Sequence, residues 1–271
     1  MLKRLIKYDM KSISKVAAPM FVVSAIVSLV CCAVLYYTFG FAEEINSLFN
    51  AIMMTGGLYL IGVLTIIAMF VIVGITIISR YYKSIFTDEG YLYMVIPVTK
   101  RSFLNSKIIS SVIWFALSAG VAWVCIFISI LLPTLLYETT LVTEAFNLIK
   151  EGLGIDQSNI ALAIAAALVN LLNSAVGLVK DVIVVICAIT IGATAFKRFK
   201  IVASIVVYLI IGFAEELFYD VVTFSVGNIV TADALLTMII NSAFDIVIML
   251  AVATVMYFIT LGILDKKINL E

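Results

Sequence analysis

Residues 212–220 read GFAEELFYD and place three carboxylates, those of Glu215, Glu216 and Asp220, inside a strongly apolar stretch. Two adjacent carboxyl groups can serve as general acid and general base, so one chemistry to consider is hydrolysis inside a membrane. The other interpretation is structural, namely that the acids mark the place where a membrane-spanning chain turns back. The choice between the two depends on the rest of the chain.

Other residue types do not support a catalytic role for this acid pair. CAAX-type intramembrane proteases carry a double glutamate, an apolar–aromatic run and an arginine, but Asp220 stands where that family has its arginine. That family also needs histidines, and this sequence has none. The four cysteines lie in apolar runs and are interpreted as small hydrophobic side chains. We therefore expect no catalytic residue, no metal site and no enzyme activity in this chain.

The composition is that of a membrane protein. Hydrophobic residues make up 64% of the 271-residue chain and charged residues 13%, against roughly 45–50% and 25% in soluble domains. A soluble fold cannot bury that much apolar surface, so we expect an all-α membrane protein whose single transmembrane domain covers residues 1–271. Six transmembrane helices are predicted at about 16–41, 52–79, 104–136, 159–196, 201–219 and 238–264.

Basic residues are concentrated on alternate connections between these helices. All 17 lysines and arginines except Lys150 and Lys180 lie in the N-terminal stretch, in the second-to-third and fourth-to-fifth connections, or in the C-terminal tail. By the positive-inside rule, both termini are predicted to be cytoplasmic. The opposite connections are acidic and carry Glu43, Glu44, Glu138, Glu144, Glu151, Asp156, Glu215, Glu216, Asp220 and Asp233.

Three charged residues fall inside apolar segments, which makes them functional candidates: Lys180, Asp181 and Asp245. Counting from the basic residues at the cytoplasmic ends puts Lys180 about 25 Å and Asp245 about 31 Å along their helices, near the outer boundary of the bilayer. Lys180 and Asp181 are sequence neighbours and are expected to point in different directions. Snorkelling or pairing between helices near the outer interface is favoured over a proton relay.

The same distance argument applies to the opening stretch. Glu215 is about 22 Å beyond Lys200, too short a distance to cross the bilayer directly. Apolar residues resume after the acids, and Gly227 with Asn228 forms a break. We expect a fifth helix that stops in the outer leaflet, followed by a re-entrant segment packed on protein or lining a wet cavity. The acids would line an outer vestibule or cap the re-entrant helix.

The second-to-third connection has an unusual composition for a loop. It reads RYYKSIFTDEGYLYMVIPVTKRSFLNSK from Arg80 to Lys107. Thr87 or Asp88 can cap a short helix that Pro97 ends, and Thr99 can cap the third span. A short Tyr-, Phe- and Leu-rich element flanked by acids is typical of a protein-docking surface. An aromatic belt lying on lipid is an equally good interpretation of these residues alone.

This connection resembles the loop between the second and third spans of type-2 ATP-binding-cassette exporter permeases from Gram-positive bacteria. The resemblance lies in the FxDEGYL-like stretch, the proline step that follows, and the basic entry into the third helix. Other family features occur in the same order over nearly the full chain: a basic amphipathic N-terminal helix, six spans, cytoplasmic termini and a broken excursion between spans five and six. The outer connection between spans three and four is longer than in a minimal member.

The resemblance implies that residues 80–103 form a coupling loop that docks on a separate cytoplasmic ATPase. It also implies a second permease subunit, identical or different, so that the complex is a dimer in contact with membrane lipid and without nucleic acid. The chain holds no cofactor, and ATP and Mg belong to the partner ATPase, since no GxxxxGK[ST] motif is present here. The ATPase-coupling residues would be Phe86, Thr87, Asp88, Glu89, Gly90, Tyr91 and Leu92.

Two further segments complete the expected organisation. Residues 1–15 are predicted to form an amphipathic helix on the inner leaflet, with its lysines and Arg4 on one face. Residues 137–158 are predicted to form an extracellular protrusion. In sum, we expect the permease subunit of an exporter of an amphipathic or hydrophobic substrate, such as a peptide, in the bacterial cell membrane. The alternative is a non-transporting sensor or immunity protein that binds peptide at the outer face.

Overall fold

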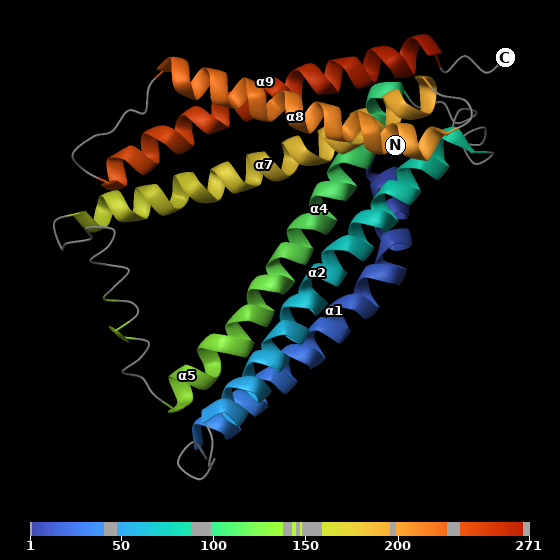
Figure 1. Ribbon diagram of the computed structural model, residues 1–271. Coiled ribbons are helices and arrows are strands. Elements are labelled where there is room, and N and C mark those ends of the chain that lie inside the picture. Colours follow the sequence, from blue (N-terminus) through green and yellow to red (C-terminus); the bar gives the residue numbers. More distant parts are fainter. Residues whose placement is uncertain are drawn as a thin grey trace. The chain divides into compact units, whose positions relative to one another are not determined.

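The computed structural model describes residues 2–40, 48–87, 99–137, 143–144, 147, 159–195, 199–226 and 234–267 (Figure 1). All regular structure in these ranges is helical. Six of the described helices are long and apolar enough to cross a membrane. The prediction of an all-helical chain with six potential membrane spans is therefore confirmed, and it supports a multi-pass membrane protein.

The helix boundaries follow the apolar segments closely, with several spans longer than predicted. The third span consists of an α-helix, a π-helical stretch and a short further α-helix, which follow one another without a break. The π-helical stretch was not predicted from the sequence. The bounds are α1 Leu2–Gly40, α2 Leu48–Phe86, α4 Lys100–Ile126, η1 Phe127–Leu131, α5 Leu132–Tyr137, α7 Ile160–Ala195, α8 Lys200–Val226 and α9 Ala234–Lys267.

The first helix differs from the expected separation between an interfacial helix and a span. α1 is continuous over 39 residues and contains Pro19 in its interior. At 1.5 Å per residue it is about 58 Å long, nearly twice the roughly 30 Å of a bilayer core. Residues 2–15 are therefore part of the same helix as the first span, and Pro19 does not interrupt it.

The chain divides into two compact units. The N-terminal unit consists of Tyr8–Ile77 and Ile113–Glu151, and the C-terminal unit of Met1–Lys7, Ile78–Val112 and Gly152–Glu271. In the N-terminal unit α1, α2 and α4 lie side by side around a small core (Figure 1). That core contains Ile13, Ala17, Val73, Ile77 and Trp114.

A polar strip runs through the N-terminal unit beside the π-helical turn. The Tyr59 hydroxyl donates to the carbonyl oxygen of Ser129 over 3.4 Å, and the Ser129 hydroxyl lies 3.5 Å from the carbonyl oxygen of Ser28. A cavity of about 50 Å³ lies next to these groups and also contacts Cys31 and Cys125. The π-turn therefore places a backbone carbonyl where another helix can hydrogen-bond to it.

In the C-terminal unit, α7 is the central helix and packs against both α8 and α9. In α7, half of the most apolar 18-residue stretch is buried. The corresponding share is 11% in α8 and 17% in α9. α7 and α8 approach closely at Gly192, where an added Cβ would lie 2.5 Å from the backbone of Ser204. Only glycine fits at such a crossing, so Gly192 determines how closely the two helices approach.

Several interhelical contacts gather the basic ends of the helices at one end of the C-terminal unit. Near the end of α2, the Tyr81 hydroxyl is 2.7 Å from the Thr190 hydroxyl near the end of α7. At the start of α4, Lys100 donates to the carbonyl oxygens of Leu264 and Asp265 at the end of α9, over 3.0 and 3.3 Å. These contacts define a basic end of the unit, which also includes the start of α8.

Candidate functional site

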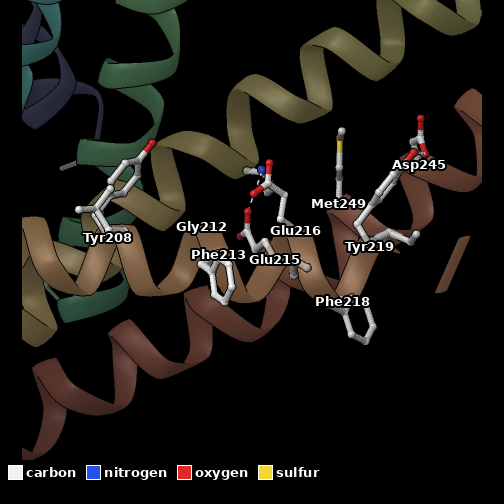
Figure 2. Close-up of a pocket in the computed structure, with 13 residues that line it drawn as sticks. Tyr208, Gly212, Phe213, Glu215, Glu216, Phe218, Tyr219, Asp245 and Met249 are labelled. Atoms are coloured by element: carbon white, nitrogen blue, oxygen red, sulfur yellow. Dashed lines mark hydrogen bonds and ion pairs between the residues drawn. The ribbon is translucent and has the colours of Figure 1, made fainter. Parts of the chain in front are cut away.

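Four charged residues from the apolar helices of the C-terminal unit line one pocket between α7, α8 and α9 (Figure 2). Its volume is about 510 Å³, within the roughly 300–1,000 Å³ typical of small-molecule sites. The pocket brings together Lys180, Glu215, Glu216 and Asp245, which the sequence singled out separately. Its lining consists of Lys180, Tyr208, Leu209, Gly212, Phe213, Glu215, Glu216, Phe218, Tyr219, Asp245, Ile248, Met249 and Val252.

Lys180 lines this pocket and forms ion pairs with two carboxylates. Its ammonium Nζ lies 3.0 Å from Glu215 Oε2 on α8 and 2.9 Å from Asp181 Oδ1 on its own helix. Pairing between helices, one of the arrangements expected for Lys180, is therefore present. The expectation that Lys180 and Asp181 point apart is wrong, because the long lysine side chain reaches back to its neighbour.

The two carboxylates around Lys180 differ in their surroundings. The Glu215 side chain is 20% exposed, whereas the Asp181 side chain is 68% exposed. A partly buried charge pair is screened less by solvent than an exposed one. The bond between Lys180 and Glu215 is thus the stronger structural link, and it joins α7 to α8 about 22 Å along α7 from its basic end at Ala195.

A second polar contact closes the other side of the pocket, between α8 and α9. The Tyr219 hydroxyl donates to Asp245 Oδ1 over 2.8 Å, and Figure 2 shows the tyrosine directed at this carboxylate. Glu215 and Tyr219 are four residues apart on α8, so they lie on the same helical face. One face of α8 therefore reaches α7 through Glu215 and α9 through Tyr219.

Two carboxylate groups in the pocket retain unused hydrogen-bonding capacity. Glu215 Oε1 is buried and has no hydrogen-bond partner among the described residues. Glu216 is exposed and forms no hydrogen bond or ion pair with the described part of the chain. With one lysine against three carboxylates, the lining has a formal net charge of minus two.

The helix that carries GFAEELFYD does not stop where the sequence suggested. α8 continues without interruption from Lys200 to Val226, so Glu215 and Glu216 lie in its interior. The expectation that these acids cap the end of a re-entrant helix is therefore wrong: interior amides are already bonded within the helix. The re-entrant excursion itself would have to follow Val226, and residues 227–233 lie outside the described residues.

Asp220 occupies a different position from the two glutamates. It lies on the same helix and is exposed, but it is not part of the pocket lining. It does take part in an interaction of its own. Of the three carboxylates in the opening stretch, the structure therefore brings two into the pocket.

The predicted coupling residues are described only at their start. Phe86 is the last residue of α2, and the Thr87 hydroxyl donates to the carbonyl oxygen of Lys83 over 2.6 Å. The remaining residues, from Asp88 to Leu92, lie outside the described part of the structure, as does most of the predicted protrusion at 137–158. The connection is shorter than the predicted 80–103, because α2 continues through Phe86.

Thr99 takes the capping role predicted for it at the start of the third span. Its hydroxyl oxygen accepts a hydrogen bond from the backbone N–H of Ser102 over 3.3 Å. A capping hydroxyl satisfies one of the free N–H groups at a helix start. The helix therefore begins at Lys100, with the basic residues of the connection in its first turn.

Sequence reasoning missed two residues that organise this unit. Tyr219 could have been found, because its spacing from Glu215 places it on the same face of an apolar helix. The attachment of Lys100 to the end of α9 has no sequence signal, since the two partners are 164 residues apart. Among the described residues, no group of three or more potential metal ligands comes together.

Comparison with models of protein families, with curated proteins and with solved structures finds no match to this chain. Function must therefore be argued from the residues, from the helices that carry them and from the pocket.

Proposed function

We propose that this chain is the membrane permease subunit of an ATP-driven exporter, which moves an amphipathic substrate outward by alternating access. A separate ATPase subunit binds ATP and Mg and docks on the connection between α2 and α4. A second permease subunit, identical or different, completes the complex in a bacterial cell membrane. Both termini of the chain are cytoplasmic in this proposal, on the side of the basic end.

The observation that carries the proposal is the stretch FTDEGYLYMVIP and its place in the chain. It connects the second and third of six apolar helices, and basic residues flank it on both sides. An aromatic–acidic segment at the end of a helical bundle is suited to receive a protein partner. The chain has no nucleotide-binding loop of its own, so an ATP-driven cycle requires such a partner.

The contacts at the basic end support a mechanical role for this connection. Five residues before its N-terminal boundary, Tyr81 is bonded to Thr190 of α7. At its C-terminal boundary, Lys100 is bonded to the end of α9. A displacement of the connection would therefore act on α7 and α9 through two hydrogen-bonded attachments.

Those two helices also carry the charged pocket: Lys180 lies ten residues before Thr190 on α7, and Asp245 lies in the half of α9 away from Leu264. α7 contributes Lys180 and α9 contributes Asp245, while α8 contacts both. Relative movement of α7 and α9 would change the distances among these groups. The proposal therefore links the docking connection to the pocket through the rigid helices α7 and α9. Such coupling requires that the packed helices have two discrete arrangements.

The test is ATPase activity that depends on the connection. The tagged chain is purified in a gentle detergent together with the ATPase that accompanies it, and substrate-stimulated ATP hydrolysis is measured after reconstitution. Asp88→Lys combined with Tyr91→Ala is expected to remove the stimulation while leaving the protein in the membrane. Glu138→Lys combined with Tyr137→Ala is the matched control, since it changes an acid and an aromatic in the predicted outer connection.

A different result would favour the non-transporting alternative. If no P-loop ATPase accompanies the chain under gentle conditions, and the chain binds peptide from the outer side alone, then a sensor or immunity role replaces the permease. Full stimulation in the Asp88→Lys, Tyr91→Ala variant would remove the connection from the mechanism.

A further inference from the structure

The residues that line the pocket between α7, α8 and α9 are of two chemically different kinds. The charged ones are Lys180, Glu215, Glu216 and Asp245, whose formal charges leave an excess of two negative charges. The others are mostly aromatic and apolar side chains. These include Tyr208, Phe213, Phe218, Ile248 and Met249.

Three of the apolar lining residues are also largely exposed on the surface of α8. Phe213 and Phe218 are 64% and 53% exposed, and Leu209 is 62% exposed. All three lie on α8, which is the least buried of the six apolar helices. A molecule with an apolar body can therefore reach the pocket from within the bilayer, with its body remaining against this face of α8.

The charged residues of the lining offer acceptors that the described part of the protein leaves unused. Lys180 satisfies Glu215 Oε2 but not the buried Oε1 atom. Glu216 has no partner among the described residues. A buried carboxylate oxygen without a donor has a desolvation cost that a cationic ligand would offset. Aromatic faces beside carboxylates are also the usual surroundings of bound organic ammonium groups.

We propose that this pocket binds amphipathic organic cations, with the cationic head between Glu215, Glu216 and Asp245 and the apolar body along the aromatic side of α8. Calling the bound cation a transported substrate rests on the proposed function. The binding itself does not, because it follows from the pocket alone.

The ligand head can come from two sources that share this chemistry. One is a free amphipath such as a drug or a lysine-rich peptide. The other is the ammonium head group of a membrane lipid. Both place a cation beside the carboxylates and hydrocarbon beside Phe213 and Phe218, so the pocket recognises their common chemistry.

Binding of radiolabelled tetraphenylphosphonium to the purified full-length chain in a neutral detergent tests the proposal. We expect saturable binding that triphenylphosphine oxide, a neutral molecule of similar aromatic shape, does not displace. In Glu216→Gln the dissociation constant is expected to rise about tenfold. Asp220→Asn, which removes the same charge one turn further along α8 and outside the pocket, is expected to bind like the parent.

Glu216 is a suitable position because its exposed side chain holds no other described residue in place. Asp245→Asn provides a second variant that keeps an acceptor for Tyr219, and it is also expected to bind more weakly. Equal binding by the parent and both variants would overturn the proposal. Displacement by triphenylphosphine oxide as effective as by unlabelled tetraphenylphosphonium would also overturn it, because the pocket would then be merely apolar.

Two further comparisons complete the experiment. Added phosphatidylethanolamine is expected to compete with the probe if a lipid head group is the natural occupant, and phosphatidylglycerol is not. The assay contains no ATP and no ATPase, so its outcome is independent of the proposed permease function. If no P-loop ATPase accompanies the chain but cation binding is intact, the permease is refuted and the binding site stands.

Discussion

Lys180 Nζ on α7 lies 3.0 Å from Glu215 Oε2 on α8, and this ion pair joins two helices within their apolar spans. Both side chains are about four-fifths buried. In such surroundings each charge offsets the desolvation cost of the other. The pair therefore links α7 to α8 and also forms part of the lining of the candidate pocket.

Removing one member of this pair is expected to destabilise the protein more than removing both charges. Lys180→Met leaves Glu215 without its cation and is expected to cost about 1–3 kcal/mol of folding free energy. Lys180→Met combined with Glu215→Gln should recover part of that loss, because the carboxylate that still lacks its cation, Asp181, is 68% exposed to solvent. Thermal unfolding of the purified protein in detergent measures both, and a double variant less stable than Lys180→Met would contradict this account.

The crossing of α7 and α8 at Gly192 gives a second prediction. Gly192→Ala introduces a methyl group 2.5 Å from the backbone of Ser204, so the helices must move apart. Overpacking of this kind costs about 1–3 kcal/mol, which should appear as a lower unfolding temperature. The control is Gly262→Ala on α9, where nothing lies within 4 Å of the added Cβ. That variant should be neutral or slightly stabilising, and an equal loss in both variants would rule out the close crossing.

The attachment of α2 to α7 can be tested without disturbing packing. Tyr81→Phe removes only the hydroxyl that lies 2.7 Å from that of Thr190, and both residues are buried. Thr190 keeps its bond to the carbonyl oxygen of Ile186, so the loss should be about 1 kcal/mol. Faster amide hydrogen exchange at the end of α2 would accompany it. Tyr82→Phe is the neighbouring control, and an effect as large in that variant would argue against a specific attachment.

Orientation in the membrane can be checked by labelling introduced cysteines with an impermeant reagent on intact cells. Cysteines at Ser47 and Ser158 are expected to react from outside, because they lie in the acidic connections. A cysteine in place of Lys83 should not react, because it lies at the basic end, which is cytoplasmic in the proposal. The Lys83 side chain is exposed, so a lack of reaction there would not be due to burial. Reaction at Lys83 would reverse the proposed orientation.

Burial determines which position can report on the basic end in that experiment. Ser84 is next to Lys83 in sequence but is only 4% exposed, and its hydroxyl donates to the carbonyl oxygen of Tyr81. A cysteine there would stay unlabelled on either side of the membrane. The chain without introduced cysteines serves as the control for the native thiols, of which Cys31, Cys125 and Cys187 are buried.

The amino-acid sequence by itself determined the class of the protein and the number of its apolar helices. Both depend on runs of consecutive residues, and a run of about 20 apolar residues requires a helix in lipid whatever lies next to it. The concentration of basic residues on alternate connections is equally local. So is the hydroxyl cap that Thr99 provides for α4, because it involves a residue only three positions away.

The tertiary structure alone decided which of the charged residues meet. Lys180 and Glu215 are 35 positions apart, and Lys100 is 164 positions from its partner at the end of α9. Such pairs depend on which helical faces come together, and that is decided by close packing such as the contact at Gly192. The continuation of α8 past Glu216 was also not predictable from the sequence. Acids in an apolar stretch favour a helix end in lipid, but a helix interior tolerates them where a neighbouring helix supplies a lysine.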